Sequence, residues 1–276
     1  MQQFRSISVG LVAWMGILTM VGVTQSRDQP LRHDTGQSVS PSFEGWYPNP
    51  DGTFSLSFGY LNRNFEQTLD IPVGMNNHFE PGPTDRGQPT HFLSRRQTGI
   101  FTVTVPANFG DQTLTWSLTA GNETIDIPGH LRPEWQIDSM HEITSDNRPP
   151  VVKFGTSEDG KLGPDGPRHT ITGSVGEQVP LTLWVSDDGI KKRPSGRPPL
   201  LGVAWTKYRG PGSVEFNDGM PDIDSDGKAT TSARFSDPGD YIVRVLAWDD
   251  SGPQGNIMAG GFFCCWTNGY VSIRIE

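Results

Sequence analysis

Cysteine is almost absent from this 276-residue chain, in which only Cys264 and Cys265 occur. The sequence contains no C-x-x-C-H haem motif and no pair of C-x-x-C zinc motifs. The Gly-x-Ser-x-Gly elbow of serine hydrolases, the P-loop and the Gly-x-Gly-x-x-Gly dinucleotide motif are absent as well. Because no catalytic signature is spelled out, we predict that the protein is not an enzyme.

Basic and apolar residues are also scarce. Lys and Arg number 22 against 31 Asp and Glu, which gives a formal net charge of -9. An acidic surface repels phosphate backbones, so we expect no nucleic-acid partner. Hydrophobic residues make up 34%, whereas Gly 33 and Pro 23 are abundant, which favours short strands joined by turns over long helices. The composition therefore predicts an all-β protein.

Long apolar runs are missing beyond the N-terminus. Residues 1–26 combine a positive Arg5 with an apolar stretch and end in small residues, a pattern typical of a cleaved signal peptide. An uncleaved membrane anchor is the alternative. We expect residues 27–42 to form a flexible tether, with no membrane span after leader removal. The protein is then exported, to the periplasm, the cell surface or the medium.

Strand patterns begin after the tether and predict a first β-sandwich domain over residues 43–135. Phe54, Leu56 and Phe58 alternate with small polar residues, which is the period of a half-buried strand. Similar alternation follows at 101–105. Strands with one apolar face need a second sheet to cover that face, so a sandwich is expected. An irregular segment, 62–97, interrupts the strands and is where a site in this domain would lie.

A linker over residues 136–150 is predicted next, followed by a second β-sandwich domain over 151–276. In this domain Trp205 and Tyr241 fall on the inward faces of alternating strands. The opposite face of the strand that starts at Tyr241 is also partly apolar, because it carries Leu246 and Trp248. Either the insertion 251–268 or the first domain should cover that face.

The second domain resembles the PKD-type immunoglobulin-like domains of secreted proteins. The resemblance rests on an acidic turn after Val185, the Trp205 strand followed by Gly-Pro-Gly, and the Pro-Gly-Asp-Tyr turn at 238–241. It departs from the family in insertions at 191–201 and 251–268. The resemblance implies an immunoglobulin-like sandwich with an adhesion-like or accessory role, and it implies no chemistry. The first domain resembles no particular family.

Two acidic groups are candidate sites for Ca²⁺, the one cofactor that the sequence suggests. Alternating carboxylates before a glycine resemble the first half of a calcium loop, although Ala233 stands where the closing acid belongs. This first group consists of Asp222, Asp224 and Asp226. The second group would assemble from loops at one end of the second domain. Its members are Asp146, Asn147, Asp187, Asp188, Asp249 and Asp250. Ordinary solvated turns are the alternative for both groups.

The sequence allows three chemical states for the two adjacent cysteines. Cys264 and Cys265 form a strained vicinal disulfide, remain two thiols with one buried, or bond to another chain. An oxidising compartment favours the vicinal bridge, because exported proteins keep few free thiols.

Several aromatic side chains are candidates for stacking on a ligand, with a core or interface role as the alternative. They are Trp46, Tyr47 and Trp184, with Trp135 and Trp266 as further members. Taken together, the sequence predicts a secreted or cell-envelope binding or structural protein that meets protein or glycan surfaces. A carbohydrate-binding accessory protein is one alternative, and an exported hydrolase with its site in 62–97 is another.

Overall fold

The computed structural model describes residues 32–142, 146–156, 159–189, 201–249 and 264–276. Strands form the regular structure of these residues, and the helical element among them is the 3-10 turn η1 (Pro133–Trp135). The all-β prediction is confirmed. Within the described ranges, no helix has the length and apolar character needed to cross a membrane.

Three of the predicted segments lie wholly or mostly outside the described residues. They are the leader at 1–26 and the insertions at 191–201 and 251–268. Residues 39–42, which fall within the predicted tether at 27–42, belong to the first strand.

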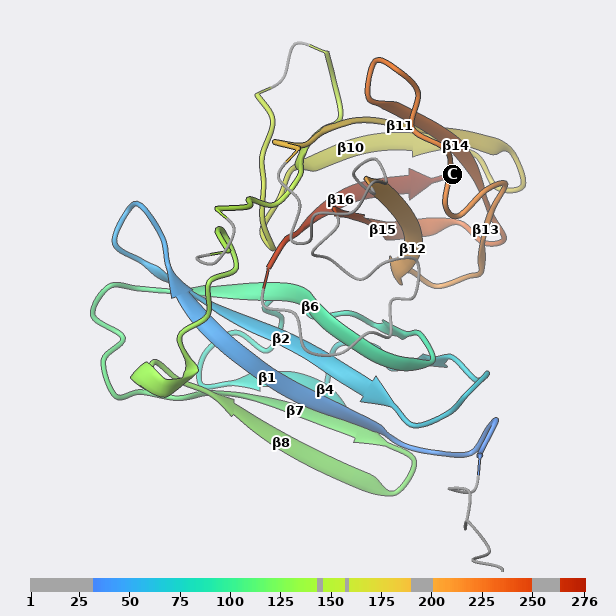
Figure 1. Cartoon of the computed structure of the whole chain (residues 1–276). Coiled ribbons are helices and arrows are strands. Elements are labelled where there is room, and N and C mark those ends of the chain that lie inside the picture. The colour runs from blue at the N-terminus through green and yellow to red at the C-terminus, as the bar shows by residue number, and fades with distance from the viewer. Residues whose placement is uncertain (1–31, 143–145, 157–158, 190–200, 250–263) are drawn as a thin grey trace, which may run out of the picture. The chain divides into compact units, whose positions relative to one another are not determined.

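The first sandwich is built from two three-stranded antiparallel sheets (Figure 1). One sheet has the order β1 (Val39–Pro48), β2 (Phe54–Asn62), β6 (Arg95–Val105). The other has the order β4 (Asn77–Glu80), β7 (Leu114–Ala120), β8 (Glu123–Gly129). The segment between β2 and β6 also holds a small sheet made of β3 (Leu69–Asp70) and β5 (His91–Phe92).

Aromatic rings fill the core of the first sandwich. Trp116 is fully buried, and its ring centroid lies 5.2 Å from that of Phe101, 5.9 Å from Phe79 and 6.1 Å from Phe58. Such edge-to-face and stacked pairs add to the burial energy of the rings. The alternation in the sequence thus corresponds to strands with an aromatic interior.

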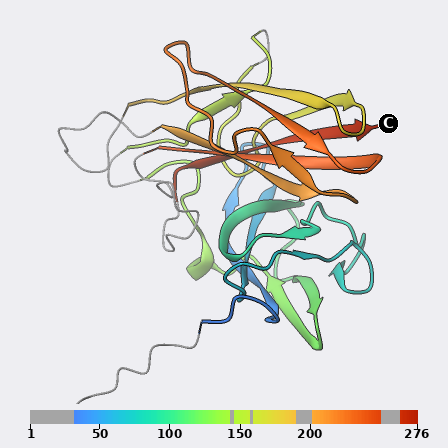
Figure 2. The same cartoon turned by 90° about the vertical axis from the view of Figure 1, so that its right-hand side faces the viewer.

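The second sandwich is built from two four-stranded sheets (Figures 1 and 2). One has the order β10 (Arg168–Gly173), β16 (Trp266–Ile275), β15 (Gly239–Trp248), β12 (Gly202–Arg209). The other has the order β13 (Val214–Phe216), β14 (Lys228–Phe235), β11 (Gln178–Ser186), β9 (Val151–Lys153). The pairing of β10 with β16 is parallel, and the other pairings are antiparallel.

Aliphatic side chains dominate the second core, together with Trp205 and Tyr241. Trp205 is 3% exposed and Tyr241 is 1% exposed, so both lie inside as the alternation predicts. The opposite face of β15 is covered as well. Its Ile242 packs against the core cluster of the first sandwich, to which Tyr208 and Tyr270 also belong.

By their contacts, residues 33–276 form one compact unit. The division of this unit into domains at 43–135 and 151–276 stays a prediction.

Candidate functional site

Side chains of β16 bind the backbone of β6, and these contacts form the first part of what we call the junction. Trp266 Nε1 donates to the Gly99 carbonyl at 3.1 Å, and Asn268 Nδ2 donates to the same oxygen at 2.8 Å. The Tyr270 hydroxyl donates to the Ile100 carbonyl at 2.7 Å. All three donors are buried, so leaving any of them unpaired would be costly. The β6 backbone is therefore held at a defined position.

Contacts of β12 with the segment before β6 form the second part of the junction. Tyr208 donates its hydroxyl to the Gly87 carbonyl at 2.5 Å, and Arg209 Nε donates to the Gln88 carbonyl at 2.7 Å. The two terminal nitrogens of Arg209 donate to the two carboxylate oxygens of Asp85 at 2.9 and 2.8 Å. These hydrogen bonds lower the pKa of Asp85.

Arg244 lies within the junction and is 3% exposed. Its Nε donates to Oδ1 of Asn268 at 2.9 Å, so this hydrogen-bond partner is a neutral amide. Burial lowers the pKa of Arg244, and the nearby rings of Tyr270 and Tyr208 oppose that effect. A buried cation is tolerated only where the surrounding polar atoms are closely fitted.

Glu44 supports the junction from β1. Its carboxylate accepts from the Gly99 amide at 2.5 Å and from Arg96 at 2.8 Å. Burial raises the pKa of Glu44 to about 7, although Arg96 and the Gly99 amide act in the opposite direction. Gly99 itself has φ +56, and a Cβ at this position would overlap the indole of Trp266. Only glycine fits there without a shift of the junction.

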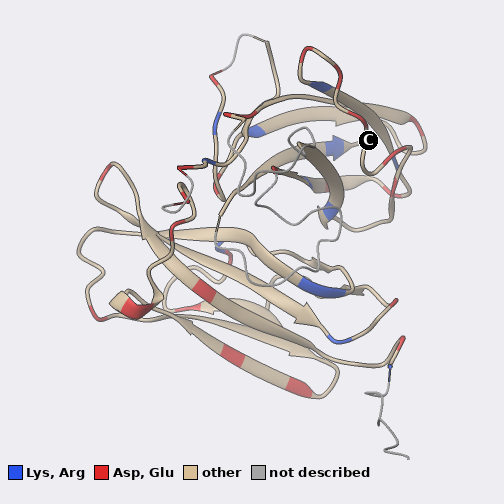
Figure 3. Cartoon of the chain, viewed as in Figure 1, with Lys and Arg blue, Asp and Glu red and all other residues tan. Residues whose placement is uncertain are grey.

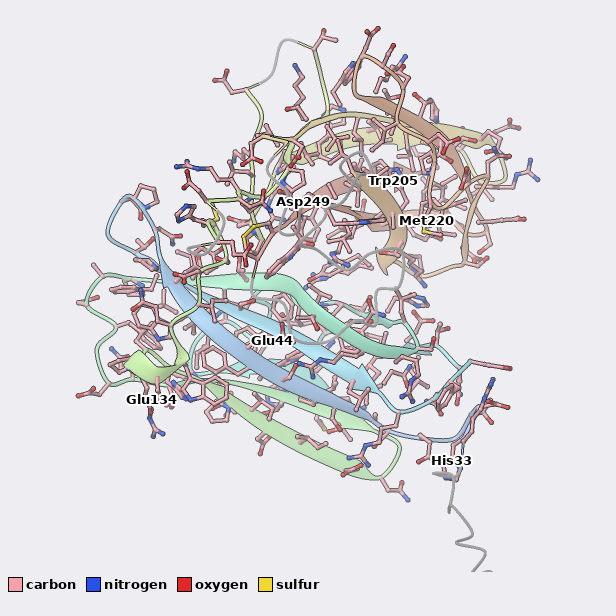
Figure 4. The ribbon with its side chains drawn as sticks, in the orientation of Figure 1. His33, Glu44, Glu134, Trp205, Met220 and Asp249 are labelled. Atoms are coloured by element: carbon pink, nitrogen blue, oxygen red, sulfur yellow. A yellow bond between two sulfur atoms is a disulfide. The ribbon has the colours of Figure 1, made fainter. Side chains whose placement is uncertain are left out.

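A separate cavity of about 380 Å³ lies beside η1 and β1. It is lined by Glu44, Glu134, Trp135, Gln136, Ile137 and Asp138. Trp135 is 43% exposed, and its ring stacks on Phe43 with centroids 5.5 Å apart. Figure 4 labels Glu44 on β1 and Glu134 on η1, so acidic walls come from both elements.

The aromatic candidates differ in exposure, and the stacking prediction needs correction for two of them. Trp46 is 9% exposed and Tyr47 is 5% exposed, so neither ring offers a face to a ligand. Trp184 is half-buried, with the Lys228 ammonium 5.8 Å from its ring centroid. Trp266 is buried in the junction. Trp135 is the exposed indole among the described residues.

The first acidic group lies in the turn that leads into β14. Oδ1 of Asp224 accepts from the amides of Asp226 at 2.9 Å and Lys228 at 2.8 Å, as in an Asx-type turn. The described residues contain no group of three His, Cys, Asp or Glu side chains placed to hold a metal ion. Calcium binding at Asp222, Asp224 and Asp226 stays a prediction, which melting with and without a chelator would test.

The structure brings together part of the second acidic group. Asn147 Nδ2 donates to Asp249 at 2.8 Å, and the Arg148 amide donates to Asp188 at 3.0 Å. Burial raises the pKa of Asp187 to about 6, and the charges of Asp249 and Asp188 add to the rise.

The two remaining members of that group are Asp146 and Asp250. Asp146 contacts the imidazole of His141. Asp250 lies outside the described residues. Calcium binding at this second group likewise stays a prediction.

A disulfide joins Cys264 to Cys265, and both residues are buried. Sγ of Cys265 lies 3.5 Å from the Asn147 carbonyl oxygen, which places the disulfide beside the second acidic group. Of the three states that the sequence allows for these cysteines, the structure contains the disulfide between the two neighbours.

The segment 62–97 is less irregular than its sequence suggests. Asn77 Nδ2 donates to the carbonyls of Ile71 at 2.9 Å and Pro89 at 2.8 Å, while its Oδ1 accepts from Trp116. One buried amide thus ties three parts of the first sandwich together. The segment also supplies the carbonyls that β12 binds in the junction. No single residue in its sequence signals that role.

No family model matches this sequence, and no curated protein matches it. Among solved structures, the chain is similar to the D0-D1 domain of Intimin, with a TM-score of 0.25, 11% identity, and coverage of 86% of this chain and 97% of that chain. It is also similar to the Yersinia pseudotuberculosis adhesin InvE, with a TM-score of 0.25, 10% identity, and coverage of 86% and 58%. Domains 4 and 5 of the S-layer protein SbsC give a TM-score of 0.23, 12% identity, and coverage of 88% and 98%. Likenesses of this size establish neither family nor function, and the β-sandwich assignment rests on the strand pairing itself.

Proposed function

We propose that this protein is an exported, non-catalytic binding or structural protein whose two sandwiches act as one rigid unit. The observation that carries the proposal is the junction. Backbone carbonyls at Gly87, Gln88, Gly99 and Ile100 accept hydrogen bonds from side chains of β12 and β16. Relative motion of packed domains is the ordinary expectation, and such directional buried bonds oppose it. A rigid unit suits a spacer or a platform that presents a binding surface.

Export is supported by two features of different kinds. The apolar leader at 1–26 has the pattern of a signal peptide. The disulfide between Cys264 and Cys265 suits an oxidising compartment, because cytosolic proteins usually keep their thiols reduced.

A PKD-type identity for the second sandwich belongs to the same proposal. Two of the sequence motifs that carry the resemblance meet at one residue. Tyr241 donates its hydroxyl to the Asp237 carbonyl at 2.8 Å and accepts from the Gly212 amide at 3.0 Å. The Pro-Gly-Asp-Tyr turn is thereby fastened to the Gly-Pro-Gly turn, which gives a physical reason for both motifs.

The proposal is tested by fractionating producing cells and sequencing the N-terminus of the recovered protein. We expect a mature chain that begins near residue 27 and that binds to isolated cell envelopes with a saturable isotherm. It should not turn over a panel of polysaccharides and esters. Turnover that is lost on substitution within 62–97 would establish the hydrolase alternative, and an intact leader in the cytosol would remove export.

A further inference from the structure

The cavity beside η1 has a preformed aromatic wall. One face of the Trp135 ring stacks on Phe43, and the His130 ring lies nearly perpendicular to the indole, with an interplanar angle of 82° and centroids 5.7 Å apart. Both neighbours restrict rotation of the indole, although 43% of the residue remains exposed. An apolar surface held in a fixed orientation can bind a ligand with little loss of side-chain entropy.

The backbone around this ring is fixed to β1. Trp46 Nε1 donates to the Arg132 carbonyl at 2.8 Å, and the Ile137 amide donates to the Trp46 carbonyl at 2.9 Å. At Gly45, a Cβ would lie 2.5 Å from the Trp135 carbonyl oxygen, so glycine allows the segment to lie directly on the strand. The walls of the cavity are therefore built in advance of any ligand.

The charge of the cavity is negative. In the described part of the chain, the carboxylates of Glu134 and Asp138 have neither a hydrogen-bond nor an ion-pair partner, and both line the cavity. Figure 3 shows η1 and the middle of β1 marked as acidic. Glu44 contributes less charge, because Arg96 and the Gly99 amide already bind its oxygens. An anionic ligand would be repelled here, whereas a cation with N–H donors would gain charge-assisted hydrogen bonds.

We infer that Trp135, Glu134 and Asp138 form a binding site for an organic cation, an ammonium or guanidinium group carried on a small organic molecule or side chain. This inference rests on the proposed binding function and names the ligand chemistry of one site. The cation lies over the indole, whose electron-rich face attracts it, and the two carboxylates accept its hydrogen bonds. A cavity of about 380 Å³ accommodates a basic side chain or a single amino sugar.

The test uses the full mature chain labelled with 5-fluorotryptophan and observed by ¹⁹F NMR, with Trp135→Phe to assign the Trp135 signal. The cationic probes are the α-acetyl methylamides of lysine and arginine, and glucosamine. Their neutral counterparts are the ε-acetylated lysine derivative and N-acetylglucosamine. We expect saturable shifts of the Trp135 signal with cationic probes, and an affinity that falls as salt is added. The lysine, arginine and glucosamine arms separate a polypeptide source from a sugar source.

A matched pair of charge variants completes the test. The double variant Glu134→Gln, Asp138→Asn should weaken cation binding about tenfold or more, as the loss of charge-assisted contacts implies. The control Asp111→Asn, Asp126→Asn changes the net charge equally at exposed positions outside the cavity and should bind like the parent. Equal binding of charged and neutral probes, no shift with any probe, or equal affinity of the two double variants would overturn the inference. If cation binding fails while envelope binding persists, the proposed function stands without this site.

Discussion

The two sandwiches share a two-layer form but are packed in different ways. The first is filled by rings around Trp116, whereas the second is filled mainly by aliphatic side chains such as Leu183 and Val243. In a simple sandwich each sheet buries one face and exposes the other, but a strand of the first sandwich departs from that arrangement. In β2 the polar residues Ser55 and Ser57 are nearly as buried as Leu56 between them, so both faces of this strand are enclosed. A period-two pattern therefore locates strands, but the pattern does not reveal how many faces are buried.

The largest expected effect comes from removing a central side chain from each core. Trp116→Ala should lower the free energy of unfolding by about 4 kcal/mol, because it removes a ring that packs against several others. Leu183→Ala in the second core should cost about 3 kcal/mol. Denaturant unfolding measures both. If the sandwiches unfold as one cooperative unit, each variant shifts the midpoint of the same single unfolding transition. A variant that shifts only one of two unfolding steps would show that the sandwiches unfold separately.

Alanine substitutions at two glycines with positive φ test how tightly the junction is packed. Gly99→Ala should cost about 3 kcal/mol, the sum of backbone strain and a clash with Trp266. Gly121→Ala is the control, because Gly121 has φ +63 but open space around it, and should cost about 1 kcal/mol. Thermal or denaturant melting compares the pair. Equal losses would mean that the clash with Trp266 is relieved at no cost.

The pH dependence of stability tests the buried carboxylate behind the junction. The pKa of Glu44 is raised from 4.5 to about 7, so the folded state binds the proton more tightly than the unfolded state does. The resulting stabilisation is complete below about pH 4.5 and is lost as the pH rises to about 7. The loss is on the order of 3 kcal/mol, since one pKa unit corresponds to about 1.4 kcal/mol.

A second carboxylate contributes to the same pH profile at lower pH. Asp187 acts in the same direction up to about pH 6, because its pKa is raised as well. Glu44→Gln should therefore flatten the stability curve most clearly between about pH 6 and 7, as measured by denaturant unfolding across that range. An unchanged curve would contradict the assignment to Glu44.

The smallest effect compares two arginines that each bind one carboxylate through two nitrogens. Arg209 binds Asp85 within the junction with its side chain 17% exposed, and Arg274 binds Asp240 with its side chain 64% exposed. Arg209→Lys should cost about 1 kcal/mol, because lysine cannot donate in a fork, whereas Arg274→Lys should leave the stability unchanged within error. Chemical denaturation at matched salt separates the two outcomes. A larger loss at Arg274 would contradict the importance assigned to the junction.

The sequence predicts much of the fold because alternation is local. The strands around Phe58 and Tyr241 lie where the pattern places them, and Trp205 lies in the core. Leu246 and Trp248 predict that the second face of β15 is covered, and the first sandwich supplies part of the cover through contact with Ile242. The order of strands in each sheet and the partner of each face depend on long-range pairing, which alternation alone does not specify.

The burial of β1 was harder to predict because the strand is irregular. Its register shifts between Phe43 and Gly45, after which Trp46 pairs with Leu56 and Tyr47 with Ser55. Trp46 therefore belongs to the aromatic core, while Tyr47 lies on the opposite face, which is covered too. A shift of one residue cannot be read from the alternation of side chains.

The residues of the junction could not be predicted from the sequence, whereas one residue of the cavity could. Asn268 and Tyr270 look like ordinary strand positions, and their partner carbonyls belong to a segment far away along the chain. Glu44 has no local signal that would mark it as buried. Trp135 does have one, since it follows a proline and an acid outside the alternating strands.

Differential scanning calorimetry of the mature protein tests most directly whether the junction joins the sandwiches into one unit. We predict a single transition whose calorimetric enthalpy equals its van't Hoff enthalpy. Two resolved transitions would contradict a rigid two-sandwich unit. The contradiction would be complete if Gly99→Ala left the midpoint temperatures of both transitions unchanged.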